Sequence, residues 1–216
     1  MIILSVTACS GSGFRLQNLA KSEADFVADA HYAETQRLMR RLTTKLYRRN
    51  PAELSKTRYA TIDMRVEQLF GNAGPLMLAE LNFQRGTDAL NLALDENYRG
   101  DRVLALMTGL NGMIRNAYEY RPEFFMLDRL NEQKLYQSAR NIEILMWRLN
   151  RARAVNGQPL ILTNSLPGES PNRSFERLFG KLIALQDMMA VVVSQQNDRV
   201  INKVAQNVAS MVFFPL

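Results

Sequence analysis

The side chains that most often carry chemistry in proteins are scarce in this sequence, which has one cysteine, Cys9, and one histidine, His31. A lone histidine without further histidine or cysteine ligands cannot complete a usual zinc site, and no pattern pairs it with a nucleophile. The Glu-x-x-His pairs of helical di-metal centres are absent. We therefore predict no catalytic residues, no metal, no cofactor and no enzymatic activity, and we expect His31 to be a buried or half-buried structural residue.

Cys9 lies between an apolar run and a flexible tract, since Ile2 to Ala8 precede it and Ser10 to Gly13 are serine and glycine. An apolar segment that ends in small residues is typical of a secretory signal. The tetrapeptide Val6-Thr7-Ala8-Cys9 resembles the lipobox of bacterial lipoproteins, which runs aliphatic, small, small, cysteine.

This resemblance implies that the Cys9 thiol is alkylated with diacylglycerol, that a peptidase cleaves before it and that the new amino group is acylated. Residues 1–15 are then a residual signal peptide, the lipidation site and a tether, and residues 16–216 are a single all-helical domain. Ser10 stands where enterobacterial lipoproteins retained at the inner membrane have aspartate, so the resemblance favours the outer membrane, facing the periplasm. Only eight residues precede Cys9, none of them basic, so we expect translation to start upstream of Met1. The alternative interpretation is a buried N-terminal strand with a buried cysteine.

The composition is that of an ordinary globular protein with a basic balance. Its 216 residues include 27 Lys and Arg against 21 Asp and Glu, a formal charge of +6. Such a charge favours anionic partners but does not choose among phospholipid, cell-wall polymer and nucleic acid. A single cysteine excludes an internal disulfide, so packing alone must hold an exported chain together. No apolar stretch is long enough to span a bilayer, since the best, 182–193, is interrupted by Gln186 and Asp187.

The hydrophobic periodicity predicts an all-α fold of six or more helices. The expected helices cover residues 16–49, a short segment from Pro51, 61–70, two short pieces within 76–94, 103–117, 130–153 and a long segment from Ser174. We expect Asn50 to cap the helix that Pro51 starts, with Glu53 reaching back, and Ser174 to cap the last helix. That last helix should be central to the core and either continue almost to the chain end or break near Asn197.

A run of basic residues without an acidic residue between them lies in the first predicted helix: Arg37, Arg40, Arg41, Lys45, Arg48 and Arg49. Apolar residues at 38, 39, 42 and 46 occupy the other half of the circumference. The functional interpretation is a patch that binds anionic lipid head groups or a polyanion. The alternative is a solvated face balanced by acids elsewhere. Nucleic acid is not expected as a partner, because Tyr47 is the only aromatic residue interleaved with the run.

Two apolar segments are further candidates for contacts with a partner. Aromatic residues flank the break at Arg121-Pro122, namely Tyr118, Tyr120, Phe124 and Phe125. They could line a groove for a partner or an apolar ligand, or plug the end of the helical body. Residues 213–216 are apolar to the last, so we expect them to be docked on the body or on a partner.

Three functions remain open from the sequence. The first is a lipid-anchored, periplasm-facing envelope protein that binds another protein or supports an assembly. The second is a cytosolic helical protein that binds nucleic acid or acts as a regulator through residues 37–49. The third is a helical carrier of a small apolar ligand.

Overall fold

The computed structural model describes residues 21–58, 60–72, 74–125, 130–166, 168–197, 200–202 and 212–216. Within these ranges the chain forms seven α-helices and one 3₁₀ helix, without a strand, and this confirms the predicted all-α class. In chain order the elements are α1 (Glu23–Arg49), α2 (Pro51–Leu54), α3 (Ile62–Phe70), η2 (Ala79–Leu81), α4 (Gly86–Leu94), α5 (Arg102–Ala117), α6 (Glu132–Arg151) and α7 (Ser174–Gln196).

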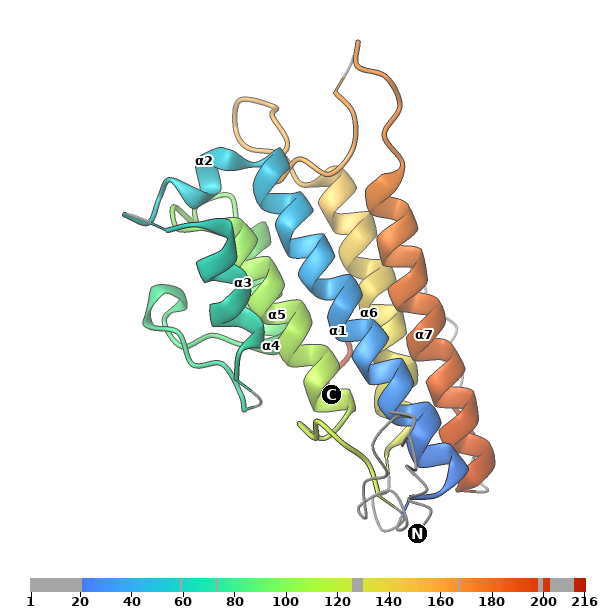
Figure 1. Cartoon of the computed structure of the whole chain (residues 1–216). Helices are drawn as coiled ribbons and strands as arrows, with labels where there is room; N and C mark the ends of the chain where they lie inside the picture. The colour runs from blue at the N-terminus through green and yellow to red at the C-terminus, as the bar shows by residue number, and fades with distance from the viewer. Residues whose placement is uncertain are drawn as a thin grey trace, which may run out of the picture.

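The long helices lie side by side, with the short ones at one flank (Figure 1). Helix α1 contacts α7 on one side and α5 and α3 on the other, while α6 packs against both α7 and α5. Helix α4 covers α5. Because α1 runs up from Glu23 and α7 runs down from Ser174 (Figure 1), these two neighbours are antiparallel.

Of the seven described α-helices, four begin with a side-chain cap, whereas α2, α4 and α7 do not. Ser22 and Asp25 form a capping box at α1, and the Asp101 side chain accepts from the Leu104 N–H at α5. Asn50 is the N-cap residue of α2 and Pro51 its first residue, as predicted, but the Asn50 side chain bonds to the backbone of Leu162 instead of capping the helix, and Glu53 does not reach back. Ser174 is likewise the first residue of α7 rather than its cap, and no side chain caps that helix.

The most enclosed helix is α5 rather than the predicted α7. Every residue of α5 is buried except Gly112 and Asn116, whereas α7 buries one face. Small residues on the second side of α5, such as Gly109, admit another helix there. A Cβ built at Gly109 would lie 2.7 Å from the carbonyl oxygen of Gly86 and from the amide nitrogen of Leu90, so α4 packs directly on the α5 backbone.

Helix α7 ends at Gln196 with Asn197 as its C-cap, which agrees with the predicted break near that residue. The remainder of the predicted segment lies mainly outside the described residues. Among the helices of the described residues, α7 alone is long and apolar enough to cross a membrane by length and composition, although the sequence predicted no such stretch. Its buried Leu182, Gln186 and Met189 pack within the body, as expected for a core helix.

The last residues of the chain are docked on the body, as predicted. Phe213 is buried, and the Arg148 guanidinium lies 4.8 Å from its ring centroid. Asn141 of α6 exchanges two hydrogen bonds with the backbone of Phe214, accepting from its N–H at 2.7 Å and donating to its carbonyl at 2.9 Å. These two hydrogen bonds hold the terminus against α6, and Asn116 of α5 donates to the Leu216 carbonyl at 3.1 Å on the other side.

Candidate functional site

The basic run of α1 divides into residues that join helices and residues that face outward. Arg40 donates to the Phe70 carbonyl at 3.0 Å and stacks on the Phe70 ring. Lys45 Nζ donates to Ser174 Oγ at 2.7 Å, at the start of α7. Arg49 donates to the Asn164 carbonyl and pairs with Glu169 in the loop that precedes α7. These three cations hold α1 to its neighbours, so the six predicted residues do not form one continuous patch.

Arg37, Arg41 and Arg48 are the outward-facing members of the run. Arg37 has 57% of its side chain exposed and forms a bidentate pair with Glu34 on the same helix. This hydrogen-bonded pair, together with Lys181 of α7, lowers the pKa of Glu34. The electrostatic influence of Lys181 shows that a second helix contributes positive charge to the same surface, which reasoning from the run alone missed.

The register of α1 against α7 extends this surface along both helices. From the contact between Lys45 and Ser174, each step back along α1 matches a step forward along α7, because both rise about 1.5 Å per residue. Arg41 is then level with residues 177–178 and Arg37 with residues 181–182. At the far end, Ala28 of α1 and Met189 of α7 line one small cavity, which agrees with this register.

The aromatic residues predicted as a groove form a plug with one exception. Tyr118 and Phe124 are buried and meet Tyr32 of α1, with ring centroids 5.1 to 6.3 Å apart. Burial raises the pKa of the Tyr118 hydroxyl. Phe125 is half-buried, and the Lys21 ammonium lies 4.9 Å from its ring centroid. These contacts close the end of the helical body, in agreement with the alternative interpretation.

Tyr120 lies outside this cluster and lines a surface hollow of about 350 Å³ between the start of α4 and the second half of α5. Gly86 and Gly112 form part of the wall, and Gly86 adopts a φ of +52°, a conformation that favours glycine. Glu119 and Tyr120 also have positive φ, at 53° and 56°. The described residues show no buried, unpartnered polar group in this hollow, so it carries no ligand assignment.

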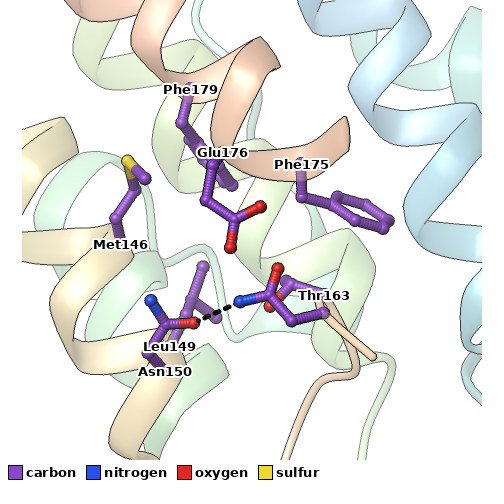
Figure 2. Close-up of a pocket in the computed structure, with 8 residues that line it drawn as sticks. Met146, Leu149, Asn150, Thr163, Phe175, Glu176 and Phe179 are labelled. Atoms are coloured by element: carbon purple, nitrogen blue, oxygen red, sulfur yellow. Dashed lines mark hydrogen bonds between the residues drawn. The ribbon is translucent and has the colours of Figure 1, made fainter. Parts of the chain in front are cut away.

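A smaller hollow lies between the end of α6 and the start of α7 (Figure 2). Phe175 and Phe179 form its apolar side, and Asn164 Nδ2 donates to Asn150 Oδ1 at 3.0 Å on the other. Glu176 Oε2 is buried there without a hydrogen-bond partner from the described protein atoms. A volume of about 10 Å³ suits one water molecule, and it is too small for an organic ligand.

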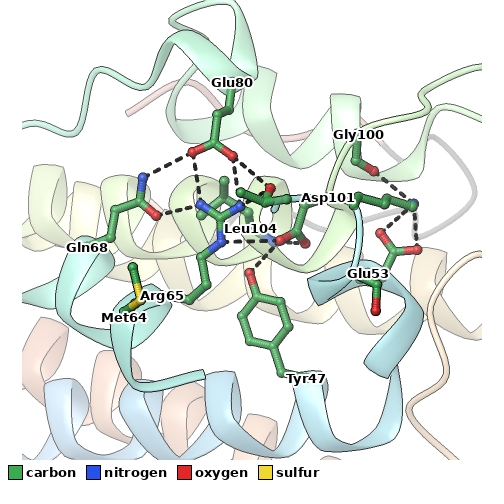
Figure 3. A network of polar contacts seen from close by, with 12 residues as sticks. Tyr47, Glu53, Met64, Arg65, Gln68, Glu80, Gly100, Asp101 and Leu104 are labelled. Atoms are coloured by element: carbon green, nitrogen blue, oxygen red, sulfur yellow. Dashed lines mark hydrogen bonds and ion pairs between the residues drawn. The ribbon is translucent and has the colours of Figure 1, made fainter. Parts of the chain in front are cut away.

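A polar network joins α1, α3, η2 and the start of α5 (Figure 3). Tyr47 Oη donates to Asp101 Oδ2 at 2.8 Å, and Arg65 lies 3.5 Å from the same oxygen. Arg65 also pairs with Glu80 at 2.7 Å, and this hydrogen bond lowers the pKa of Glu80 to about 2. Burial raises the pKa of Asp101 and, together with Asp101, the pKa of Tyr47.

A third carboxylate, that of Glu53 in α2, extends this network beyond Asp101 and Glu80. Glu53 of α2 accepts from the Arg102 N–H at 2.6 Å and from Lys56 at 2.7 Å (Figure 3). The Lys56 ammonium also donates to the Gly100 carbonyl at 2.9 Å. Every charged group has a partner of the chain itself, so the network fastens the short helices to the long ones. Sequence reasoning missed it because Tyr47 and Asp101 are 54 positions apart.

The remaining predicted residues give no chemical site. His31 is half-buried, as expected of a structural histidine, and its Nδ1 has no partner among the described atoms. The described part of the chain has no group of three His, Cys, Asp or Glu side chains placed to hold a metal ion. Cys9 lies outside the described residues. Comparisons of the chain with family models, with curated proteins and with solved structures found no match.

Proposed function

We propose that this protein is a lipid-anchored envelope protein, held at the outer membrane through Cys9, whose helical body faces the periplasm and binds a protein partner or supports an assembly. The observation that carries the proposal is the sequence Val6-Thr7-Ala8-Cys9 ahead of the Ser-Gly tract. Eleven residues separate Cys9 from Lys21, where the described body begins. At about 3.5 Å per extended residue, they reach up to about 40 Å from an acylated cysteine.

The body is held together without a disulfide, as an exported chain with one cysteine must be. A chain with one cysteine has no internal disulfide and depends on packing and polar contacts. The structure supplies both, through the enclosed α5 and through the network of Tyr47, Arg65 and Asp101. The charged residues of that network are paired with one another, which favours a structural role over a catalytic one.

Polyanion binding in the cytosol is the second candidate. Arg37 and Arg41 of α1 and Lys181 of α7 are exposed on neighbouring helices, and they would suit a phosphate-bearing polymer. The loss of Arg40, Lys45 and Arg49 to internal contacts reduces the charge available for this role. Location in the cell separates the two functions.

The test is fractionation of cells that express the gene with its natural upstream region. We expect the parent protein to sediment with outer membranes and to resist protease until the outer membrane is permeabilised, whereas Cys9→Ser should leave that fraction. Ser10→Asp is the matched variant, since it keeps the cysteine and, in an enterobacterial host, should move the protein to the inner membrane. A parent protein found in the cytosol would favour polyanion binding instead.

A further inference from the structure

The outward faces of α1 and α7 form one surface, the α1–α7 face, that is apolar at one end and basic at the other. Toward the start of α1 and the second half of α7 its exposed apolar side chains are Phe26, Val27, Ala30, Ala33, Ala184, Met188 and Val191, and Glu23 and Gln195 are exposed polar residues at the outer ends of the two helices. Toward the other end they are basic: Arg37, Arg41, Arg177 and Lys181. The antiparallel register places Val27 level with Val191 or Val192, and Arg41 level with Arg177 or Leu178.

The apolar part holds four large hydrophobic side chains that are exposed. Met188 is 56% exposed, Val191 45%, Phe26 44% and Val27 39%. Adjacent alanines carry no polar group that would hydrate the area between them. A contiguous apolar patch with charged residues at its edge marks a contact with a protein or with a membrane.

The position of the tether selects the membrane. The described body begins at Lys21, immediately before the apolar end of the α1–α7 face. A reach of up to about 40 Å from Cys9 is about the length of the 27-residue α1, at 1.5 Å per residue. A lipid anchor at Cys9 would therefore hold this surface within contact distance of the bilayer, apolar end first.

Charge supports the same occupant. Helices that lie in a membrane interface combine apolar side chains that enter the boundary of the acyl chains with Lys and Arg that meet lipid phosphates. The exposed acidic residue among the cations, Glu34, is neutralised by Arg37. A protein partner could also cover an apolar surface, but neither the tether nor the basic end would be needed for it.

We propose that the α1–α7 face lies against an anionic phospholipid bilayer, with Phe26, Val27, Met188 and Val191 in the head-group boundary and the four basic residues on lipid phosphates. This inference rests on the proposed lipid anchor, which brings the surface to the membrane. The face then sets the orientation of the body and leaves the flank of α3 and α4 turned toward the periplasm.

The test uses the full chain with Cys9→Ser, so that no acyl chain contributes, and vesicles of phosphatidylglycerol and phosphatidylcholine. We expect the protein to float with anionic vesicles at low salt and to dissociate from them as salt rises. It should not bind vesicles of pure phosphatidylcholine. Arg41→Gln with Lys181→Gln should lower partitioning about 25-fold, since each basic residue near such a surface contributes about fivefold. The charge control is Arg85→Gln with Arg99→Gln, two exposed residues off the face.

The apolar half has its own matched pair of variants. Met188→Ser with Val191→Ser should lower partitioning about tenfold, because both side chains lose apolar area that would enter the interface. Met64→Ser with Val155→Ser removes the same two side-chain types from positions 59% and 95% exposed, outside the α1–α7 face, and should have no effect. Circular dichroism checks that all variants keep their helix content.

Three results would overturn the inference. The first is that the Cys9→Ser chain does not float with anionic vesicles, and the second is that the face variants and their controls lose vesicle binding equally. The third is that the chain self-associates and that Met188→Ser with Val191→Ser abolishes this association while vesicle binding is unchanged. The last would assign the surface to a second copy of the chain. None of them bears on acylation of Cys9, so failure of the face and failure of the anchor are distinguished.

Discussion

Replacing Gly109 by alanine tests whether α4 packs on the backbone of α5. The new Cβ would lie 2.7 Å from backbone atoms of Gly86 and Leu90, and backbone atoms can yield only if the helix shifts. Such overpacking costs about 1–3 kcal/mol, whereas alanine in place of glycine within a helix gains about 1 kcal/mol. We therefore expect Gly109→Ala to lower the free energy of unfolding by about 0–2 kcal/mol.

Gly180→Ala is the matched control, because Gly180 is an exposed residue of α7 with nothing within 4 Å of an added Cβ. This variant should gain about 1 kcal/mol, so the two alanine variants should differ by about 1–3 kcal/mol. Thermal and urea unfolding measure the difference, at about 2–4 °C per kcal/mol for a chain of this size. Equal stabilisation by both substitutions would show that α4 does not approach Gly109 closely.

Two further predictions concern buried and half-buried charge. Val193→Asp should lower the free energy of unfolding by several kcal/mol, because Val193 is 3% exposed and an unpaired charge is poorly tolerated there. Val191→Asp, at a position 45% exposed, should lower it far less, and urea unfolding measures both. Glu80, whose pKa falls to about 2 beside Arg65, stabilises the fold above pH 4.5 and loses that contribution as pH falls toward 2. Glu80→Gln should flatten the pH dependence of unfolding in that window, and an unchanged slope would exclude the ion pair as its source.

Local signals in the sequence predicted most of the helices correctly. Thr61 and Asp101 cap the helices that follow them, and Gly71 and Asn197 close the helices before them. These features depend on neighbours within four positions, so a single sequence contains the information. Periodicity alone does not fix the buried face of the last helix, in which Val193 is buried and Val192 only half-buried, because α7 packs against both α1 and α6.

Partners distant in the sequence could not be predicted in this way. The six basic residues of α1 looked equivalent as a run, but Arg40, Lys45 and Arg49 find acceptors 30, 129 and 115 positions away. Asn50 has a side chain suited to capping a helix, but that side chain forms its hydrogen bonds with the backbone of Leu162, 112 positions away. The α1–α7 face likewise exists only once the register of two helices far apart in the chain is known.

The most direct test of the lipid anchor is acylation of Cys9 in cells that express the gene with its natural upstream region. Metabolic labelling with a palmitate analogue, followed by mass spectrometry of the purified protein, would report both the lipid and the new N-terminus. We expect a mature chain that begins at Cys9 and carries three acyl chains, and we expect Cys9→Ser to abolish labelling and leave an uncleaved precursor. An unlabelled parent protein that retains the residues before Cys9 would contradict the proposed function.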